Sequence, residues 1–394
     1  MTHLSMPWLP LLAATLFATP ALAAPLPAQL ASLATGYSAR ALITAGAPLS
    51  DGTTFPRQND LTAYFPINER EGYLLVGHEL KWGADAYGGR FTRLKLRDNR
   101  LVGSQAWVSG MNLNCSGTIT PWGTLLSGEE FPHKAMPVSD AEGRQAYENV
   151  RIAPDAPAAS FGWIYEIRAY GETPAGQAIR RTALGRFSHE SAAVVGDREV
   201  YLTEDYENGY FYKFVADRPQ DLSAGKLFAF DRQREKWLPI TDLTNAHIAA
   251  KATGATPFNR LEDVRLGPDG ELYLAETGDD QRGDMFGRVL RYNPKTQRME
   301  VYMEGDGKRL ANPDNLVFDR HGRLLICEDQ FGPNVEKYGL NELLAVDAER
   351  RVTRIATFAK GLEPTGPSFH PNKRTLFVSA MGGAKSAVMV IDGF

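Results

Sequence analysis

A short strand pattern that carries an acidic residue at or next to its end recurs along the chain and limits the folds open to it. The sixth copy lacks the acid, and the last residues of successive copies lie 51, 75, 72, 52 and 52 positions apart. Spacings of this size are typical of repeats in which each unit is one four-stranded blade. The copies are Leu74–Glu79, Leu125–Glu130, Val200–Asp205, Leu272–Thr277, Leu324–Asp329 and Leu376–Met381.

A second strand and a tight turn precede each copy. The turns are clearest at Pro268–Gly270 and Arg320–Gly322, where the residue types suit hairpin tips. The 37 glycines and 24 prolines of the chain also favour strands joined by tight turns over helices. Six such hairpins, each extended by two weaker strands, predict an all-β chain folded as a six-bladed β-propeller.

An interval of fourteen residues separates two ligand-type residues in four of the hairpins. In an antiparallel hairpin the start of one strand and the end of the next lie at the same end, so these residues are expected to meet at one mouth of the central channel. The pairs are Cys115 with Glu129, Glu190 with Glu204, Glu262 with Glu276, and Asp314 with Glu328.

So many carboxylates in one mouth need compensation by protons, arginines or bound cations. Carboxylate oxygens suit a hard ion such as calcium, whereas Cys115 among them indicates a site that also accepts a transition metal. The spacing therefore nominates Cys115, Glu190, Glu204, Glu262, Glu276, Asp314 and Glu328 as metal ligands.

Alternatives remain open for single residues. An acid at a strand end can cap a turn or accept backbone N–H bonds without binding a metal. Arg260 can be either a salt-bridge partner or a ligand-binding residue. The two cysteines are expected on different blades, too far apart for a disulfide, so Cys327 is interpreted as a small buried residue and Cys115 as a thiolate ligand.

The N-terminus contains the chain's only apolar run of membrane-spanning length, Met6–Ala23, which ends in the small-residue pattern Ala21–Ala23. We interpret residues 1–23 as a signal peptide and residues 24–394 as one propeller domain, although an uncleaved anchor is the alternative. The expected location is periplasmic or secreted, with no membrane contact after cleavage. A net charge of -4 without basic clusters argues against nucleic-acid binding, and nothing indicates an oligomer, so a monomer is expected.

Several motifs resemble the PhoX-type alkaline phosphatases and follow the order found in that family. They are specific from about residue 110 to 280 and looser toward the C-terminus. The motifs are Asn114–Glu130, Gly185–Glu190, Tyr201–Asp205, Gly209–Val215 and Arg260–Asp263.

The resemblance implies a six-bladed propeller whose channel holds iron and calcium ions and hydrolyses phosphate monoesters. Carried over to this sequence, it implies that Cys115, Glu190 and Glu262 bind iron. It also implies that Glu130 belongs to the calcium part of the cluster and that Arg260 is the catalytic residue that holds the substrate phosphate. No nucleophile from the protein is then required.

Some features depart from the family pattern or suit another function. The chain lacks a twin-arginine export signal, its last hairpin lacks the acid, and the insertion at 131–160 is interpreted as a lid or recognition loop near the channel mouth. The stretch Asn312–Asp319 is similar to calcium-dependent lactonases of the gluconolactonase and paraoxonase type. A non-catalytic, calcium-stabilised binding propeller is a further alternative. Cys115 favours the iron cluster, because a lactonase has little use for a thiolate in its channel.

Overall fold

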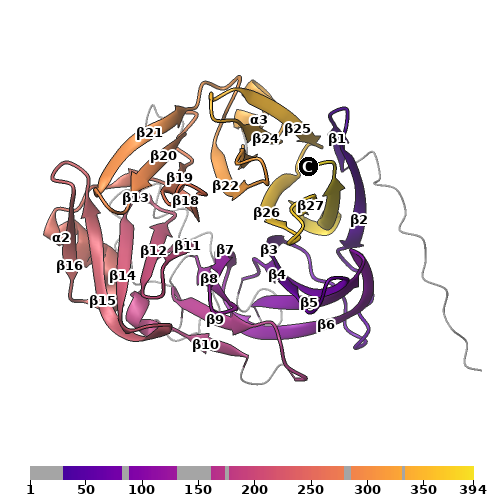
Figure 1. Ribbon diagram of the computed structural model, residues 1–394, viewed down its shortest axis with the longest axis horizontal. Helices are drawn as coiled ribbons and strands as arrows, with labels where there is room; N and C mark the ends of the chain where they lie inside the picture. Colours follow the sequence, from indigo (N-terminus) through magenta and orange to yellow (C-terminus); the bar gives the residue numbers. More distant parts are fainter. Residues whose placement is uncertain (1–29, 82–87, 131–160, 174–176, 279–284, 331–332) are drawn as a thin grey trace, which may run out of the picture.

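Six antiparallel sheets form a ring in the computed structural model of the protein (Figure 1). This arrangement confirms the prediction of an all-β, six-bladed β-propeller. The predicted signal peptide at 1–23 and the insertion at 131–160 lie outside the described residues. The structure describes residues 30–81, 88–130, 161–173, 177–278, 285–330 and 333–394.

The first three blades follow one another along the chain, and the strands of each blade run outward from the channel in chain order. Blade 1 contains β3 (Asn59–Pro66), β4 (Glu71–His78), β5 (Gly89–Arg97) and β6 (Arg100–Met111). Blade 2 contains β7 (Asn114–Ile119), β8 (Thr124–Glu129), β9 (Ile164–Arg168) and β10 (Ala178–Arg180). Blade 3 contains β11 (His189–Val195), β12 (Glu199–Glu204), β14 (Phe211–Arg218), β15 (Asp221–Asp231) and β16 (Lys236–Ile240).

The last two blades also use strands from the N-terminal part of the chain. Blade 4 contains β18 (Leu261–Leu266), β19 (Leu272–Glu276), β20 (Arg288–Asn293) and β21 (Arg298–Glu304). Blade 5 contains β22 (Pro313–Phe318), β23 (Leu324–Glu328), β24 (Glu342–Val346), β25 (Val352–Phe358) and β1 (Ala31–Leu33). Blade 6 contains β26 (Glu363–Phe369), β27 (Thr375–Met381), β28 (Ala387–Asp392) and β2 (Ser38–Thr44).

A few short elements lie outside the blades. Strands β13 (Glu207–Gly209) and β17 (Phe258–Asn259) pair with each other. Within the described ranges, the helices are α2 (Ala246–Thr253), α3 (Pro333–Tyr338) and the 3-10 turns Thr182–Leu184, Leu243–Asn245 and Gly383–Lys385. Among the described residues, no helix has the length and apolar character needed to cross a bilayer.

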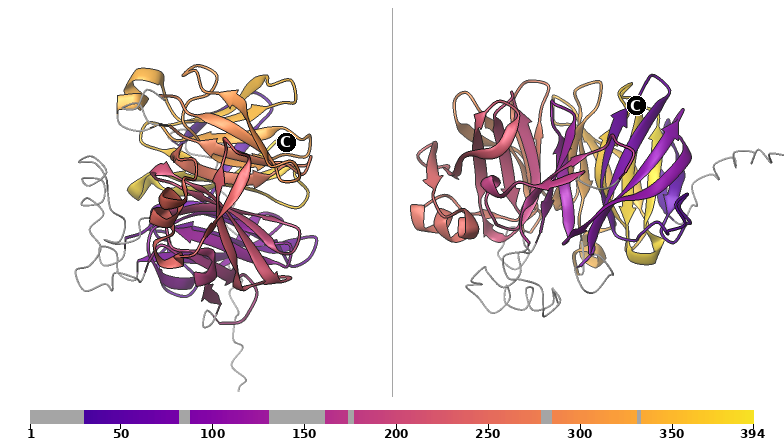
Figure 2. Two further views of the ribbon diagram at one scale, coloured as in Figure 1. Left: turned by 90° about the vertical axis from the view of Figure 1, so that its left-hand side faces the viewer. Right: turned by 90° about the horizontal axis from the view of Figure 1, so that it is seen from below.

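The ring is closed by pairing the two ends of the chain. Strand β2 runs antiparallel to β28, with Ser38 opposite Asp392, and completes the blade that β26 begins. The innermost strands β3, β7, β11, β18, β22 and β26 each contact the next around the ring (Figure 1). Seen from the side, the strands run across the thickness of the disc, so their ends lie on its two faces (Figure 2).

The hydrophobic core is divided into six clusters, one at each boundary between neighbouring blades. Both faces of a sheet are therefore buried, which explains the continuous apolar runs in the second strands, such as Leu74–Val76 in β4 and Leu324–Cys327 in β23. Leu74 packs toward blade 6, whereas its neighbour Leu75 packs toward blade 2, and both are fully buried. Cys327 lies in the cluster between blades 5 and 6, which confirms the prediction that it is a buried core residue.

The innermost strand of each of the first five blades begins with the same irregularity. The pairing register shifts just after the first residue of β3, β7, β11, β18 and β22. In blade 2, for example, Cys115 and Ser116 together lie opposite Gly128. A β-bulge of this kind changes the direction of a side chain. In β26 the shift comes later, between Thr365 and Ser368, so blade 6 presents different residues at this end.

Candidate metal centre

A small cavity of about 140 Å³ in the channel is lined almost entirely by ionisable residues. The thiol of Cys115 and the guanidinium of Arg260 lie in its wall together with nine carboxylates. The carboxylates belong to Asp60, Glu79, Glu130, Glu190, Asp205, Glu262, Asp314, Asp329 and Glu363.

Two positions in each hairpin supply most of these residues. The second residue of the bulged inner strand gives Asp60, Cys115, Glu190, Glu262 and Asp314. The residue that directly follows the second strand gives Glu79, Glu130, Asp205 and Asp329. In blade 6 the acid comes instead from Glu363, the first residue of β26, which pairs with Met381. The last repeat therefore lacks an acid at the end of β27, as the sequence indicates, but its partner strand supplies one.

Three groups of side chains place their ligand atoms within 4.8 Å of one another. Cys115 belongs to two of the groups, and Glu190 also belongs to two, so the three groups form a connected series. The sets are Glu79, Cys115 and Glu130; Asp60, Cys115 and Glu190; and Glu190, Glu262 and Asp314. The structure thus brings together five of the predicted ligands, Cys115, Glu130, Glu190, Glu262 and Asp314.

Hydrogen bonds from the bulges orient several of these side chains. The backbone N–H of Ser116 donates to Glu190 Oε1 at 3.2 Å, across the boundary between blades 2 and 3. Asn315 Nδ2 donates to Asp314 Oδ1 at 2.8 Å. Cys115 Sγ lies 3.5 Å from Glu130 Oε2. Glu190 is therefore held by a backbone N–H of a bulge, and Asp314 by a side-chain amide.

Burial opposes the charge of these acids. It raises the pKa of Asp60 to about 7 and that of Glu79 to about 8, and nearby carboxylates add to the effect. Burial, followed by the acids around it, also raises the pKa of Glu190 well above its usual range. The pKa of the Cys115 thiol is raised in the same way, first by burial and then by Glu190 and Glu130. Cations bound in the cavity would therefore favour ionisation of this set.

The donor chemistry fits two kinds of ion. The groups around Cys115 combine a soft thiolate with carboxylates, which suits a transition metal such as iron. The group of Glu190, Glu262 and Asp314 offers only oxygen, which suits a hard cation such as calcium. The triad of Cys115, Glu190 and Glu262 implied by the family resemblance is divided between two groups that share Glu190.

Arg260 brings the only positive charge to the cavity among the residues that the structure describes. Its Nε and Nη2 donate to the two carboxylate oxygens of Asp205, each at 3.0 Å, and Nη2 also donates to Glu262 Oε1 at 2.5 Å. Burial opposes the charge of Arg260, but Asp205 and Glu262 outweigh it and raise its pKa well above the usual value. Arg260 is therefore a salt-bridge partner that also lines the cavity, and its ligand-binding role stays a prediction.

The backbone at Arg260 is left-handed, with φ of 59°. Arg260 lies two positions before the cavity residue Glu262. The residues at the same position in three other blades are also left-handed: Gln58, Leu113 and Asn312, with φ of 51°, 47° and 47°. Left-handed conformations are uncommon for residues other than glycine and are often found at functional sites. A common turn therefore leads the chain into the bulge.

Three predicted ligands, Glu204, Glu276 and Glu328, do not line the cavity, and this corrects the expectation from the fourteen-residue interval. Because side chains alternate along a strand, the acid that ends the second strand faces away from the residue that follows it. Glu204 accepts hydrogen bonds from Tyr210 N and Tyr212 Oη and lies 3.0 Å from His247 Nδ1. The ligand-type residue is the next one along the chain.

The fourteen-residue interval instead reflects a structural hydrogen bond. Glu276 Oε1 accepts from Asn259 N at 2.8 Å, and Glu328 Oε1 accepts from Ala311 N at 2.8 Å. Each donor lies three residues before the cavity residue of its blade, and Glu129 accepts from Asn112 N in the same way. These glutamates therefore fix the turn that precedes the ligand, which is the backbone-binding alternative for a strand-end acid.

Sequence reasoning missed Asp60, Glu79, Asp205, Asp329 and Glu363 as site residues. The available signal was the run of two acids in Glu129–Glu130, Glu204–Asp205 and Glu328–Asp329, in which one acid binds backbone and the next faces the channel. The sequence contains no such signal for Asp60. It lies nineteen residues before Glu79, the acid at the end of its hairpin, and so does not fit the fourteen-residue interval.

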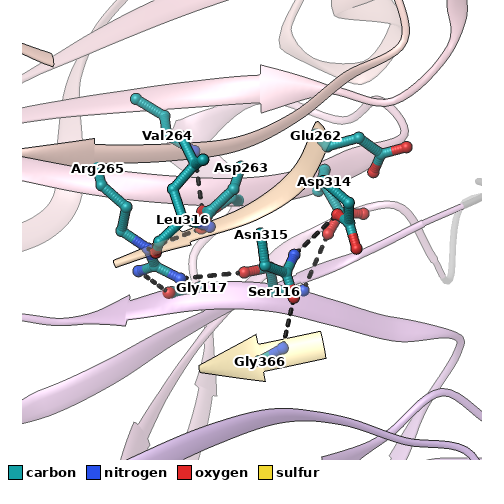
Figure 3. Close-up of polar contacts among 12 residues, drawn as sticks. Ser116, Gly117, Glu262, Asp263, Val264, Arg265, Asp314, Asn315, Leu316 and Gly366 are labelled. Carbon is teal, nitrogen blue, oxygen red and sulfur yellow. Dashed lines mark hydrogen bonds and ion pairs between the residues drawn. The ribbon is translucent and has the colours of Figure 1, made fainter. Parts of the chain in front are cut away.

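A layer of polar contacts lies beside the ligands and joins several blades (Figure 3). Arg265 of β18 donates from Nε to Asp263 Oδ2 at 2.8 Å and to the carbonyl of Leu316 at 2.9 Å. Its Nη1 donates to the carbonyl of Gly117 on β7. Its Nη2 donates to the hydroxyl of Ser116 on the same strand at 3.2 Å. Arg265 thus links blades 2, 4 and 5 and holds the strands that carry the ligands.

These features define a six-bladed β-propeller whose channel carries a candidate metal centre. The chain belongs to the PhoX family of alkaline phosphatases, because the family model "Alkaline phosphatase PhoX" matches residues 92–381. The family resemblance inferred from the motifs is thereby confirmed. No curated protein sequence matches the chain.

Solved structures share the fold. Pseudomonas fluorescens PhoX in complex with vanadate, a transition state analogue, has a TM-score of 0.77 and 22% identity, covering 94% of this chain and 97% of that chain. The gluconolactonase XC5397 from Xanthomonas campestris has a TM-score of 0.53 and 11% identity, covering 95% and 99%. A protein of unknown function from Dyadobacter fermentans has a TM-score of 0.51 and 12% identity, covering 92% and 100%. At these identities the likeness establishes the propeller architecture.

Proposed function

We propose that the protein is an exported phosphatase that hydrolyses phosphate monoesters at an iron and calcium centre in the propeller channel. The observation that carries this proposal is the cavity itself. A buried thiol and nine carboxylates surround it together with one guanidinium, in a chain of the PhoX family. An anionic ester is then recognised by Arg260 and by the cations that the acids require.

The proposed ligands follow the family resemblance. Cys115, Glu190 and Glu262 would hold iron, and Glu130 would contribute to calcium binding. Asp314, which lies with Glu190 and Glu262 in the group that offers only oxygen, would also contribute to calcium binding. Bound cations would supply Lewis-acid charge, which neutralises phosphate oxygens and lowers the pKa of a bound water. Cys115 has the role of a ligand in this scheme, so it does not act as a nucleophile.

Arg260 is the proposed phosphate-binding residue. A planar guanidinium suits the oxygens of a phosphate group, and Asp205 fixes the plane of this one through two parallel hydrogen bonds. The contact from Nη2 to Glu262 ties the same guanidinium to a metal ligand. Arg260 is therefore oriented relative to the centre before a substrate arrives.

The proposed setting is the periplasm or the exterior, after removal of residues 1–23. The protein is proposed to act as a monomer on a small phosphate ester, without nucleic acid or membrane partners. Export of an unfolded chain through the general route would require that the metals be loaded outside the cytoplasm.

The test is phosphate release from p-nitrophenyl phosphate by protein purified without chelator. The wild-type protein should be active, and Glu262→Gln should lower kcat/KM by about 100-fold or more, since it loses a ligand that also contacts Arg260. Glu69→Gln, at an exposed position, is the matched control and should retain wild-type activity. An inactive wild-type protein that hydrolyses a lactone instead would overturn the proposal in favour of the lactonase alternative.

A further inference from the structure

A second, larger cavity adjoins the metal centre over blades 5 and 6. It has a volume of about 540 Å³ and shares Asp329, Glu363 and Met381 with the smaller cavity. Ligand sites in proteins commonly have volumes of roughly 300–1,000 Å³. Because the two cavities meet at these three residues, the larger one lies next to a phosphate bound in the smaller one.

We infer that this cavity binds the organic group of the phosphate ester, and that it selects a largely apolar group carrying a hydrogen-bond donor. The inference rests on the proposed phosphatase function and specifies its substrate class. It concerns residues that none of the family motifs in the sequence includes.

The walls of this cavity are mainly apolar. Val335, Leu340 and Leu362 line it together with Met381, which also lines the smaller cavity. Leu340 is 37% exposed, a large value for a leucine, and is therefore available to a ligand. Burial of an aromatic or aliphatic leaving group against these side chains removes apolar surface from water, which favours binding.

One buried polar atom points to a hydrogen-bond donor on the ligand. Gln330 lines the cavity and is only 5% exposed, yet its Oε1 has no hydrogen-bond partner among the described residues. The rest of the residue is fixed, since its backbone N–H donates to Asn341 Oδ1 at 2.6 Å and its Nε2 lies 3.4 Å from Glu328 Oε2. Buried acceptors normally have a partner, so a hydroxyl or amine of the ligand is expected at this atom.

Gln330 belongs to the wall of the larger cavity alone, whereas the preceding residue, Asp329, lines both cavities. At the outer rim, Glu336 and Lys360 form an exposed ion pair with Oε1 and Nζ 3.5 Å apart. The polar contact is thus expected within the larger cavity, away from this charged rim.

The test compares esters and non-hydrolysable analogues that differ in the organic group. Leu340→Trp and Ala359→Phe each add volume to the cavity wall. Leu266→Trp is the matched control, because Leu266 is also an exposed leucine but does not line the cavity. Both filling variants should lower kcat/KM for phenyl phosphate by about tenfold or more and leave methyl phosphate within twofold. Calorimetric affinity for phenylphosphonate should fall by the same factor, and that for methylphosphonate should not change.

Gln330→Leu tests the polar contact. In the wild-type protein, the best of the three hydroxyphenyl phosphates should exceed phenyl phosphate in kcat/KM by about fivefold or more, and Gln330→Leu should abolish this advantage. The assignment of the cavity would be overturned if both filling variants lowered kcat/KM equally for phenyl and methyl phosphate, or lowered it for neither. Either result would leave the phosphatase function intact. A wild-type protein that hydrolyses none of these esters would overturn the proposed function itself.

Discussion

Arg260 and Asp205 form a bidentate ion pair across the boundary between blades 4 and 3, with Nε and Nη2 each 3.0 Å from a carboxylate oxygen. The pair places one guanidinium among the nine acids of the cavity. Since Arg260 also donates to Glu262, its orientation depends on two acids of the same cavity. This coupling makes Arg260 the most informative position for substitution.

Arg260→Met should lower kcat/KM for p-nitrophenyl phosphate by about 100- to 1,000-fold, because it removes the charge that binds phosphate. Arg260→Lys should recover only part of the loss, since an ammonium ion cannot make the bidentate contact. Arg309→Met, at an exposed ion pair, serves as the control and should behave as wild type. Full activity in Arg260→Lys or Arg260→Met would contradict the phosphate-binding role.

Cys115→Ser should lose iron while the propeller remains folded, because a hydroxyl does not supply a thiolate ligand at neutral pH. The second cysteine provides a matched control. Cys327→Ala should retain the iron but lower the free energy of unfolding by about 1 kcal/mol, since Cys327 packs between blades 5 and 6. Elemental analysis and denaturant unfolding of the two variants measure both effects. Iron content that is unchanged in Cys115→Ser would contradict the assignment of the thiol.

Two neighbouring acids, Glu328 and Asp329, should respond differently to substitution. Glu328→Ala leaves the N–H of Ala311 without its acceptor, so the free energy of unfolding should fall by about 1–3 kcal/mol with little change in kcat. Asp329→Ala removes a cavity carboxylate, so activity should fall without a comparable loss of stability. The reverse result would show that the fourteen-residue interval marks ligands after all.

This contrast shows how far the sequence could be interpreted. The hairpin spacing was sufficient to predict the six blades and to locate Cys115, Glu190, Glu262 and Asp314 at the channel. On the second strand, the spacing selected the acid one residue before the correct one. Side chains alternate along a strand, so only one of two successive acids faces the channel, and a residue count does not record which one. The correct choice depends on the bulge, which is visible only in the pairing register.

Other site residues depend on contacts that no local pattern contains. Arg265 reaches Gly117, which lies 148 residues earlier in the chain, so its role follows only from closure of the ring. Glu363 enters the cavity because the bulge in β26 is displaced relative to the other blades. Such long-range and blade-specific features could be identified only in the folded structure.

The contact between His247 and Glu204 should make stability depend on pH. Burial disfavours the charged imidazole, but the carboxylate 3.0 Å away outweighs burial and raises the pKa of His247 above its usual value of 6.5. The folded protein therefore binds this proton more tightly than the unfolded chain does. The resulting stabilisation is complete below pH 6.5 and is lost as the pH rises through the pKa of the folded state.

The measurement for this contact is urea unfolding of wild-type protein and His247→Gln at several pH values with the metal content held constant. The wild-type protein should be more stable by about 1–3 kcal/mol at pH 5.5, and the difference should shrink toward pH 9. A difference that stays constant or grows with pH would contradict a charged His247.

The central claim is that metal ions in this cavity enable the hydrolysis of phosphate monoesters. The most direct test is to measure metal content and p-nitrophenyl phosphate hydrolysis on the same sample, before chelation, after EDTA treatment and after iron and calcium are restored. We expect iron and calcium in the untreated protein, loss of activity together with the metals, and recovery only when both are restored. Activity that persists in metal-free protein, or a protein that contains calcium alone and releases no phosphate, would contradict this account.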